Sequence, residues 1–187
     1  MKAKKRIIIT GGPGSGKTSV INELKKQDYH CFDEVSRGYI MLGKENGIEN
    51  YFKEDPLTFS KFLWQGRQNQ YRESEDVEIN SKNNWLFFDR GLPDVIAYLN
   101  FTKQSIKAWE RELIKYPYDL FFLIPPEESI YHQDEERMES FDQAMAIHHE
   151  LEQTYHSLGT CIEVPFLSIE DRANFVLDRC KNQNPIY

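Results

Sequence analysis

The residues with the clearest chemistry form an octet near the start of the chain, Gly11-Gly12-Pro13-Gly14-Ser15-Gly16-Lys17-Thr18. The octet has the spacing of a phosphate-binding P-loop, in which a lysine and a threonine follow the last glycine. Glycines let the backbone curl so that successive N–H groups point at phosphate oxygens. The lysine reaches the β- and γ-phosphates, and the threonine hydroxyl is a ligand for Mg2+. With Ser19 behind it, the octet predicts a site for a nucleoside triphosphate and Mg2+.

The alternative for this octet is an ordinary glycine-rich turn between a strand and a helix. Such a turn does not need Lys17 and Thr18 together. The neighbouring sequence also favours the phosphate site, because the β-branched run Lys5–Thr10 precedes it and an amphipathic pattern from Lys17 to Lys26 follows it. A helix that begins at the lysine adds the partial positive charge of its N-terminus to the site.

A second candidate group, Asp89-Arg90-Gly91, ends the apolar run Trp85–Phe88. Ligands bind beyond the carboxyl ends of parallel strands, so Asp89 is expected beside the P-loop, where it would assist Mg2+ or act as a base. The alternative is a solvated turn, for which these residue types are also suited. Arg90 either clamps a phosphate or pairs with a carboxylate, and the sequence context favours the phosphate.

A third candidate pair, Glu34 and Arg37, follows the short strand candidate Tyr29–Phe32. The pair is expected at the same edge of the sheet as the P-loop. There Glu34 could take a proton from an acceptor hydroxyl, and Arg37 could hold the acceptor. A surface salt bridge at helical spacing is the equally weighted alternative.

A charged stretch that contains Arg137 follows the strand-breaking pair Pro125-Pro126. Transfer of a phosphoryl group needs positive charge near the equatorial oxygens and the exclusion of water. A lid over about residues 125–150 is therefore the favoured interpretation, and a solvated charged helix is the alternative.

Strands and helices alternate along the chain, which is typical of an α/β fold. The strand candidates are rich in apolar residues and lie at Lys5–Thr10, Tyr29–Phe32, Trp85–Phe88, Leu120–Ile124 and Thr160–Val164. Helices are expected over Lys17–Lys26, Pro56–Glu75, Leu92–Phe101, Ser105–Lys115, Ala144–Leu158 and after Ser168. We expect a single P-loop domain over residues 1–187, with a five-stranded parallel sheet flanked by helices.

Composition narrows the function classes further. The net charge of −7 argues against a mainly electrostatic nucleic-acid binder. The three cysteines are widely spaced, as is common in a reducing cytosol. No stretch has the length and apolar character of a transmembrane helix, so a cytoplasmic protein is expected. The oligomeric state stays open.

Four segments together resemble one family: Gly11–Thr18, Asp33–Arg37, Phe88–Asp94 and Asp134–Arg137. They follow one another as in small AAA-like ATP-binding domains of the nucleoside and nucleotide kinase-like group, which includes the ribosylnicotinamide kinase domain of bifunctional regulators. The resemblance covers the chain from Arg6 to about Leu177. It implies that Asp89 assists Mg2+ or acts as base, that Arg90 contacts the phosphoryl acceptor, and that Arg137 lies in a mobile lid.

The first functional hypothesis is an ATP- and Mg2+-dependent kinase for a nucleoside- or nucleotide-like acceptor. The second is a switch that binds ATP or GTP and controls a partner or a lipid contact; the guanine-reading Asn-Lys-x-Asp motif is absent from the sequence. A kinase needs a second cavity beside Asp89, lined by Glu34 and Arg37, whereas a switch does not.

Overall fold

The computed structural model describes residues 3–45, 47–48, 54–79, 84–131 and 140–182. These residues form a five-stranded sheet of β1 (Lys5–Thr10), β2 (His30–Phe32), β3 (Trp85–Asp89), β4 (Leu120–Leu123) and β5 (Cys161–Glu163). The strand order is β2-β3-β1-β4-β5, and every neighbouring pair is parallel. The parallel sheet and the position of β1 at its centre confirm the predicted fold class.

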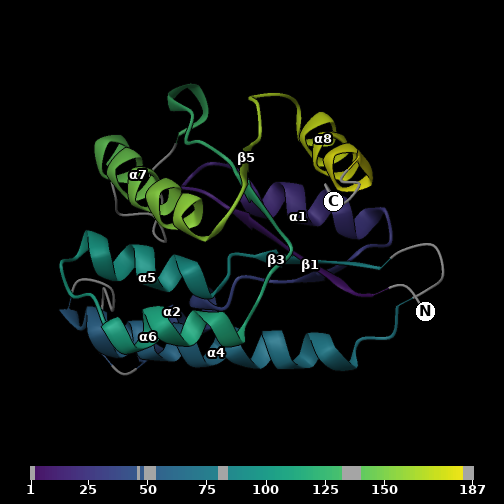
Figure 1. Cartoon of the computed structure of the whole chain (residues 1–187). Helices are drawn as coiled ribbons and strands as arrows, with labels where there is room; N and C mark the ends of the chain where they lie inside the picture. Colours follow the sequence, from purple (N-terminus) through teal and green to yellow (C-terminus); the bar gives the residue numbers. More distant parts are fainter. Residues whose placement is uncertain (1–2, 46, 49–53, 80–83, 132–139, 183–187) are drawn as a thin grey trace.

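Helices cover both faces of the sheet (Figure 1). The helices are α1 (Lys17–Lys26), α2 (Ser36–Glu45), α4 (Pro56–Asp76), α5 (Leu92–Phe101), α6 (Lys107–Glu112), α7 (Phe141–Leu158) and α8 (Ile169–Asn182). Two single 3-10 turns, η1 (Leu113–Lys115) and η2 (Glu128–Ile130), complete the elements of the described residues. The core clusters place α1 and α8 on one face of the sheet and α5 and α7 on the other, with α4 packed outside α5.

The central strand shows why the sheet is buried on both faces. Ile7 and Ile9 belong to the cluster that includes Val20 of α1, whereas Ile8 packs in the cluster that includes Ile147 of α7. Successive side chains of a strand point to opposite faces, so a continuous apolar run fills both cores at once. This arrangement fixes β1 rigidly and so fixes the loop that follows it.

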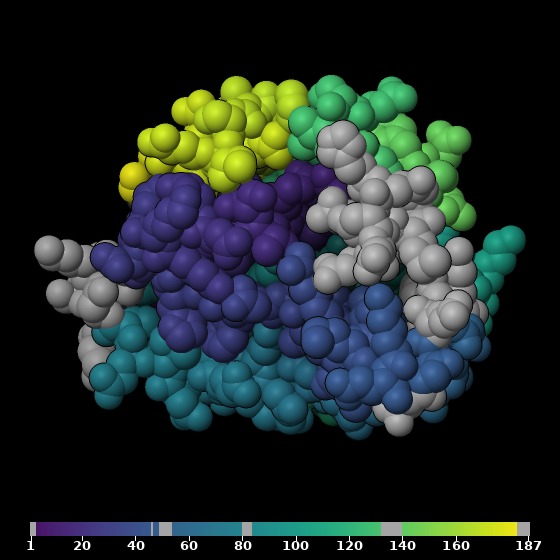
Figure 2. All heavy atoms as spheres, turned by 180° about the vertical axis from the view of Figure 1, so that it is seen from behind, coloured from purple at the N-terminus to yellow at the C-terminus, as the bar shows by residue number. Residues whose placement is uncertain are grey.

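The register of the central strands positions the site. Ile9 of β1 lies opposite Asp89 of β3, so the P-loop that follows Thr10 begins beside the carboxyl end of β3. Figure 2 shows the molecule from behind, with the N-terminal part (purple) between the C-terminal helix (yellow) and the segment that contains α2 (blue).

Two element predictions were incomplete. Helix α2 was not predicted, because its ten residues include Gly38 and Gly43, which weaken the helical signal. The helix expected over Ser105–Lys115 is a six-residue α-helix followed by the 3-10 turn η1.

The predicted lid over about residues 125–150 is only partly described. Arg137 lies outside the described residues. From Phe141 onward the segment belongs to α7, whose Ala144 and Ile147 are buried in the core. This end of the predicted lid therefore packs against the sheet in the body of the molecule, and a lid over the preceding residues stays a prediction. Within the described ranges, no helix is long and apolar enough to cross a membrane.

Candidate active site

The P-loop leaves the end of β1 with the geometry of an anion cradle. Gly14 and Gly16 have left-handed φ values of +75° and +88°, which a residue with a Cβ rarely adopts. Helix α1 begins at Lys17 with no side-chain hydrogen bond at its N-cap and no acidic residue in its first turn. The helix N-terminus is therefore suited to an anionic ligand that would complete it.

The side chain of Lys17 folds back against the P-loop. Its Nζ donates hydrogen bonds to the carbonyl of Gly12 at 2.7 Å and to Ser15 Oγ at 3.2 Å. Burial, and then the nearby Arg90, lower the pKa of Lys17 to about 7. A bound polyphosphate would supply the negative charge that the buried ammonium lacks.

Thr18 and Asp89 meet as expected for a magnesium site. Thr18 Oγ1 donates to Asp89 Oδ2 at 3.0 Å across the edge of the sheet. Burial, and then Glu34, raise the pKa of Asp89. Among the described residues, Asp89 Oδ1 is buried without a hydrogen-bond partner. An unsatisfied carboxylate oxygen beside a threonine hydroxyl fits Mg2+, which binds through a few protein oxygens plus substrate phosphates.

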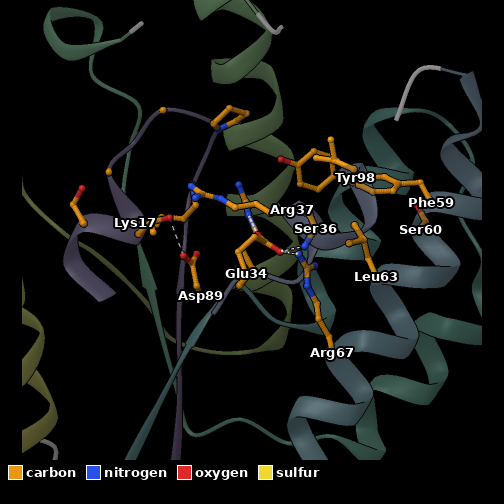
Figure 3. Close-up of a pocket in the computed structure, with 17 residues that line it drawn as sticks. Lys17, Glu34, Ser36, Arg37, Phe59, Ser60, Leu63, Arg67, Asp89 and Tyr98 are labelled. Carbon is orange, nitrogen blue, oxygen red and sulfur yellow. Dashed lines mark hydrogen bonds and ion pairs between the residues drawn. The ribbon is translucent and has the colours of Figure 1, made fainter. Parts of the chain in front are cut away.

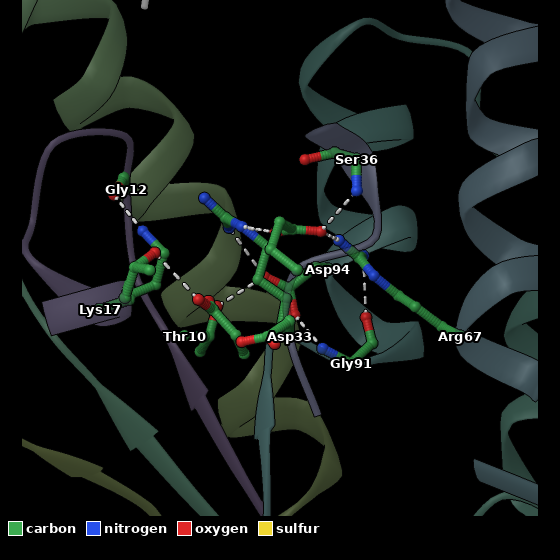
Figure 4. A network of polar contacts seen from close by, with 12 residues as sticks. Thr10, Gly12, Lys17, Asp33, Ser36, Arg67, Gly91 and Asp94 are labelled. Atoms are coloured by element: carbon green, nitrogen blue, oxygen red, sulfur yellow. Dashed lines mark hydrogen bonds and ion pairs between the residues drawn. The ribbon is translucent and has the colours of Figure 1, made fainter. Parts of the chain in front are cut away.

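Two carboxylates and two guanidinium groups form a closed ring beside the P-loop (Figure 4). Glu34 Oε2 lies 2.6 Å from Arg90 Nε, and Arg90 Nη1 lies 2.9 Å from Asp94 Oδ1. The backbone N–H of Gly91 donates to Asp94 Oδ2 at 2.8 Å, and the carbonyl of Gly91 accepts from Arg67 Nη1 at 2.9 Å. Arg67 Nη2 closes the ring on Glu34 Oε1 at 3.1 Å. We call these four side chains and Gly91 the carboxylate–guanidinium ring.

Three further donors hold the ring in place. Thr10 Oγ1 donates to Asp94 Oδ1 at 2.6 Å, and the hydroxyl of Tyr155 donates to Asp94 Oδ2. The backbone N–H of Ser36 donates to Glu34 Oε1 at 3.1 Å. Because these donors come from β1, α7 and the start of α2, the ring joins three elements at the edge of the sheet.

The ring keeps its carboxylates ionised. Burial on its own raises the pKa of Glu34, but Arg67 and Arg90 outweigh it and leave the pKa lowered. The same balance lowers the pKa of Asp94, where burial is outweighed by Arg90 and Arg67. Arg90 itself has a left-handed φ of +71°, a conformation that is uncommon for non-glycine residues.

A cavity of about 210 Å³ runs from the P-loop past Asp89 to α2 and α4 (Figure 3). Its far wall is apolar and includes Ile40, Phe59, Leu63 and Tyr98, with the hydroxyls of Ser36 and Ser60 among them. In Figure 3, Glu34 and Arg37 lie between the Lys17–Asp89 side and the α4 side. The cavity is therefore lined by the phosphate cradle at one end and has a partly apolar compartment at the other.

Most of the predicted site residues meet at this cavity. The lining includes Pro13, Gly14, Gly16, Lys17, Thr18, Ser19, Glu34, Arg37, Asp89 and Arg90. Gly11, Gly12 and Ser15 are buried in the same loop. Glu34 is a largely buried partner of Arg67 and Arg90, and not part of an exposed salt bridge. Arg90 contacts two carboxylates. Pairing with a carboxylate was the alternative to the phosphate contact that the sequence favoured for this residue.

Sequence reasoning missed the parts of the site that depend on tertiary contacts. Arg67 was not among the predicted site residues, yet it is fully buried in the ring. Its signal was a charged residue four and eight positions after Leu63 and Phe59, on the buried stripe of α4. Asp94 resembled an ordinary helix-capping residue, because it follows Gly91 by three positions.

The P-loop, the parallel sheet and the magnesium-type carboxylate at the adjacent strand define a P-loop nucleotide-binding protein. A family model described as an AAA domain matches residues 6–172. The chain therefore belongs to this AAA domain family. No curated protein matches the chain at a significant level.

Two solved structures show the same fold. A deoxyadenosine kinase from M. mycoides with bound dATP has a TM-score of 0.64 and 14% identity, over 95% of this chain and 99% of the kinase. A NadR protein in complex with NR has a TM-score of 0.70 and 15% identity, over 98% of this chain. The chain spans about half of that NadR protein, 52% of its length.

Proposed function

We propose that the protein is an ATP- and Mg2+-dependent kinase that transfers the γ-phosphoryl group to a nucleoside- or nucleotide-like acceptor. The observation that carries this proposal is the compartment beside Asp89, which is lined by Glu34 and Arg37 and continuous with the P-loop. A partly apolar compartment that shares one cavity with the phosphate cradle suits a phosphoryl acceptor. The two solved structures of the same fold add support, since one is named a nucleoside kinase and the other holds NR.

The donor half of the site is the cradle. Backbone N–H groups from Gly11 to Ser19 would surround the phosphates, and Lys17 would reach the β- and γ-phosphates. Thr18 and Asp89 would hold Mg2+, which when bound neutralises charge on the phosphate oxygens. Arg137, from the predicted lid, would add positive charge over the transferred group.

In the acceptor half of the site, we assign the role of general base to Glu34 and the role of Mg2+ ligand to Asp89. Asp89 would hold Mg2+ together with Thr18, whereas Glu34 lines the compartment, where an acceptor hydroxyl would share its oxygens with Arg67 and Arg90. An acceptor hydroxyl would donate its hydrogen to Glu34 while its oxygen bonds to the γ-phosphorus. The bond from that phosphorus to the bridging oxygen breaks, ADP leaves, and the hydroxyl proton passes to Glu34.

The test is ADP formation from ATP in the presence of Mg2+ and a panel of nucleosides and nucleotides. We expect at least one acceptor to raise the rate of ADP formation in the wild type, and Asp89→Ala and Arg90→Ala to abolish the increase. A triphosphate that stabilises the protein while no acceptor on the panel raises the rate would contradict the kinase and support the ATP- or GTP-binding switch.

A further inference from the structure

We propose that Arg172 of α8 is a positioning residue of the phosphate cradle, which holds the peptide between Ser15 and Gly16 so that its N–H faces a bound phosphate. The inference rests on the proposed function only in that the P-loop must bind a triphosphate. Arg172 lies 157 positions after Ser15 in the chain, so the sequence of the P-loop alone gives no sign of it.

The guanidinium group of Arg172 lies directly against the backbone of the P-loop. Its Nη1 donates to the carbonyl oxygen of Ser15 at 3.1 Å, and its Nε donates to the carbonyl oxygen of Leu167 at 2.8 Å. A Cβ added to Gly16 would lie 3.2 Å from the same Nη1. The group therefore joins the P-loop to the segment between β5 and α8.

The contact with Ser15 determines where the next N–H of the loop points. The peptide is trans and planar, so its C=O and N–H point in opposite directions. Because the carbonyl of Ser15 points to Arg172, the N–H of Gly16 points to the other side of the loop, and Gly16 lines the cavity. Among the described residues, no backbone carbonyl accepts from this N–H. It is therefore free to donate to a phosphate oxygen.

This peptide needs an anchor from outside the loop. Gly14 and Gly16 on either side of Ser15 have left-handed φ values, and glycine rotates more freely than other residues. Lys17 holds only the side chain of Ser15, through a 3.2 Å hydrogen bond from Nζ to Oγ. The hydrogen bond from Arg172 is what fixes the carbonyl, and with it the direction of the Gly16 N–H.

Arg172 also brings positive charge to the loop. Its side chain is only 5% exposed, and within the described part of the chain it forms no ion pair, unlike Arg67 and Arg90. Burial lowers the pKa of Arg172 and Glu127 opposes this shift, but a guanidinium stays charged at neutral pH. A phosphate in the cradle would supply the negative charge that this buried cation lacks.

Helix α8 gives Arg172 a rigid support. Ala173 and Val176 of α8 share a core cluster with Val20 of α1, the helix that completes the cradle. The ring of Phe166 lies 4.9 Å from the guanidinium carbon. Packing on both sides thus restricts the arginine to the position from which it contacts Ser15.

The experiment measures binding of two probes by calorimetry on the full chain, each with Mg2+: inorganic tripolyphosphate and a non-hydrolysable ATP analogue. If Arg172 acts through the cradle, Arg172→Met should weaken both probes by a similar factor, about ten-fold or more. Arg172→Lys keeps the charge and a donor but lacks the planar fork, so it should recover part of the affinity.

The matched control is Arg179→Met. Arg179 lies on the same helix and stacks on Phe175 at 5.0 Å, as Arg172 does on Phe166, but it is exposed. The control removes the same charge and should bind both probes like the wild type.

The outcomes separate this inference from the proposed function. Unchanged affinities in Arg172→Met overturn the inference while the P-loop function stands, and so does an equal loss in Arg179→Met, because net charge alone would then explain it. A loss confined to the ATP analogue, or a wild type that binds the analogue but not tripolyphosphate, also overturns it.

Rescue by lysine addresses a purely structural role. Equal losses in Arg172→Lys and Arg172→Met overturn the inference, because attachment of the Leu167 segment would then be what matters. If Arg172→Met does not fold, Arg172→Lys decides, with an expected loss of about three-fold or more for both probes, and wild-type affinity overturns the inference. If the wild type binds neither probe, the proposed function fails and this inference fails with it.

Discussion

Lys17 illustrates how the functional residues of this site oppose stability. Its ammonium is buried beside Arg90, and the two hydrogen bonds that it donates go to neutral oxygens of Gly12 and Ser15. Asp89 and Glu34 offset only part of the free energy that burial of this charge costs, so the arrangement is favourable mainly when a polyphosphate is bound.

We predict that Lys17→Met raises the melting temperature of the ligand-free protein. The pKa of Lys17 falls from 10.5 to about 7 on folding, so the unfolded chain binds more protons between these values. The lysine thus destabilises the fold most at and below about pH 7, and this effect fades as the pH rises toward about 10. A gain of about 1 kcal/mol would appear as roughly 2–4 °C in a thermal melt.

The same variant should lose all stabilisation by a triphosphate with Mg2+. The two melts, with and without the ATP analogue, should therefore coincide for Lys17→Met. A lower melting temperature without ligand, or retained stabilisation by the analogue, would count against the assigned role of the lysine.

Thr18 allows a test of the metal site with a built-in rescue. Thr18→Val keeps the shape of the side chain but removes the oxygen that lies 3.0 Å from Asp89 Oδ2, whereas Thr18→Ser retains an oxygen. We expect Thr18→Val to weaken Mg2+-dependent binding of the ATP analogue by about 10–100-fold. Thr18→Ser should stay near the wild type. Calorimetric titrations with Mg2+ and with EDTA measure the metal-dependent part, and equal losses in both variants would argue against a ligand role.

At the scale of elements, the turn from β3 into α5 carries much of the site within a few residues. Asp89 ends the strand, Arg90 follows in a left-handed conformation, and Gly91 joins the ring through both its N–H and its carbonyl. A Cβ at Gly91 would lie 2.2 Å from Ile8 Cδ1 of the central strand. The close approach of α5 to β1 is what brings Asp94 to the end of β1.

We predict that Gly91→Ala destabilises the protein by about 1–3 kcal/mol, because the methyl group overpacks the contact with Ile8. The shift should also move Arg90 and Glu34 and so weaken binding of the acceptor. The matched control is Gly38→Ala in α2, where a Cβ meets nothing within 4 Å. That control should be neutral or stabilising by up to about 1 kcal/mol. Urea unfolding of both variants checks the prediction, and equal stabilities would contradict it.

Local sequence signals predicted the elements that are strongly patterned. All five strands and the phosphate cradle could be predicted, because β-branched runs and the spacing of glycine, lysine and threonine are local features. Helix α2 could not be predicted, because Gly38 and Gly43 weaken the helical pattern of its sequence. Its stability comes from packing against α4. The pairing of Glu34 with Arg67 and Arg90 joins residues far apart in the chain, so no local pattern encodes it.

At the scale of the whole molecule, the ring ties α2, α4, α5 and α7 to the central strand. Its carboxylates have folded-state pKa values below their ordinary values of 4.5 for Glu34 and 3.8 for Asp94. The stability that they contribute is present above those ordinary values and is lost as the pH falls through the lowered ones. Asp89 acts in the opposite direction, because its raised pKa favours the folded protein when it is protonated.

We predict that acid unfolding of the wild type depends on Glu34. Glu34→Gln should lower the melting temperature near neutral pH, because removal of one partner leaves buried guanidinium charge unpaired, at a cost of about 3–5 kcal/mol. Its melting temperature should then fall less steeply than that of the wild type below about pH 4.5, since the variant has no Glu34 proton to take up. Melts from pH 7 down to about pH 3, with Asp33→Asn as the exposed control, test both parts. If Glu34→Gln loses stability in acid as steeply as the wild type does, the ring is not what holds these elements together.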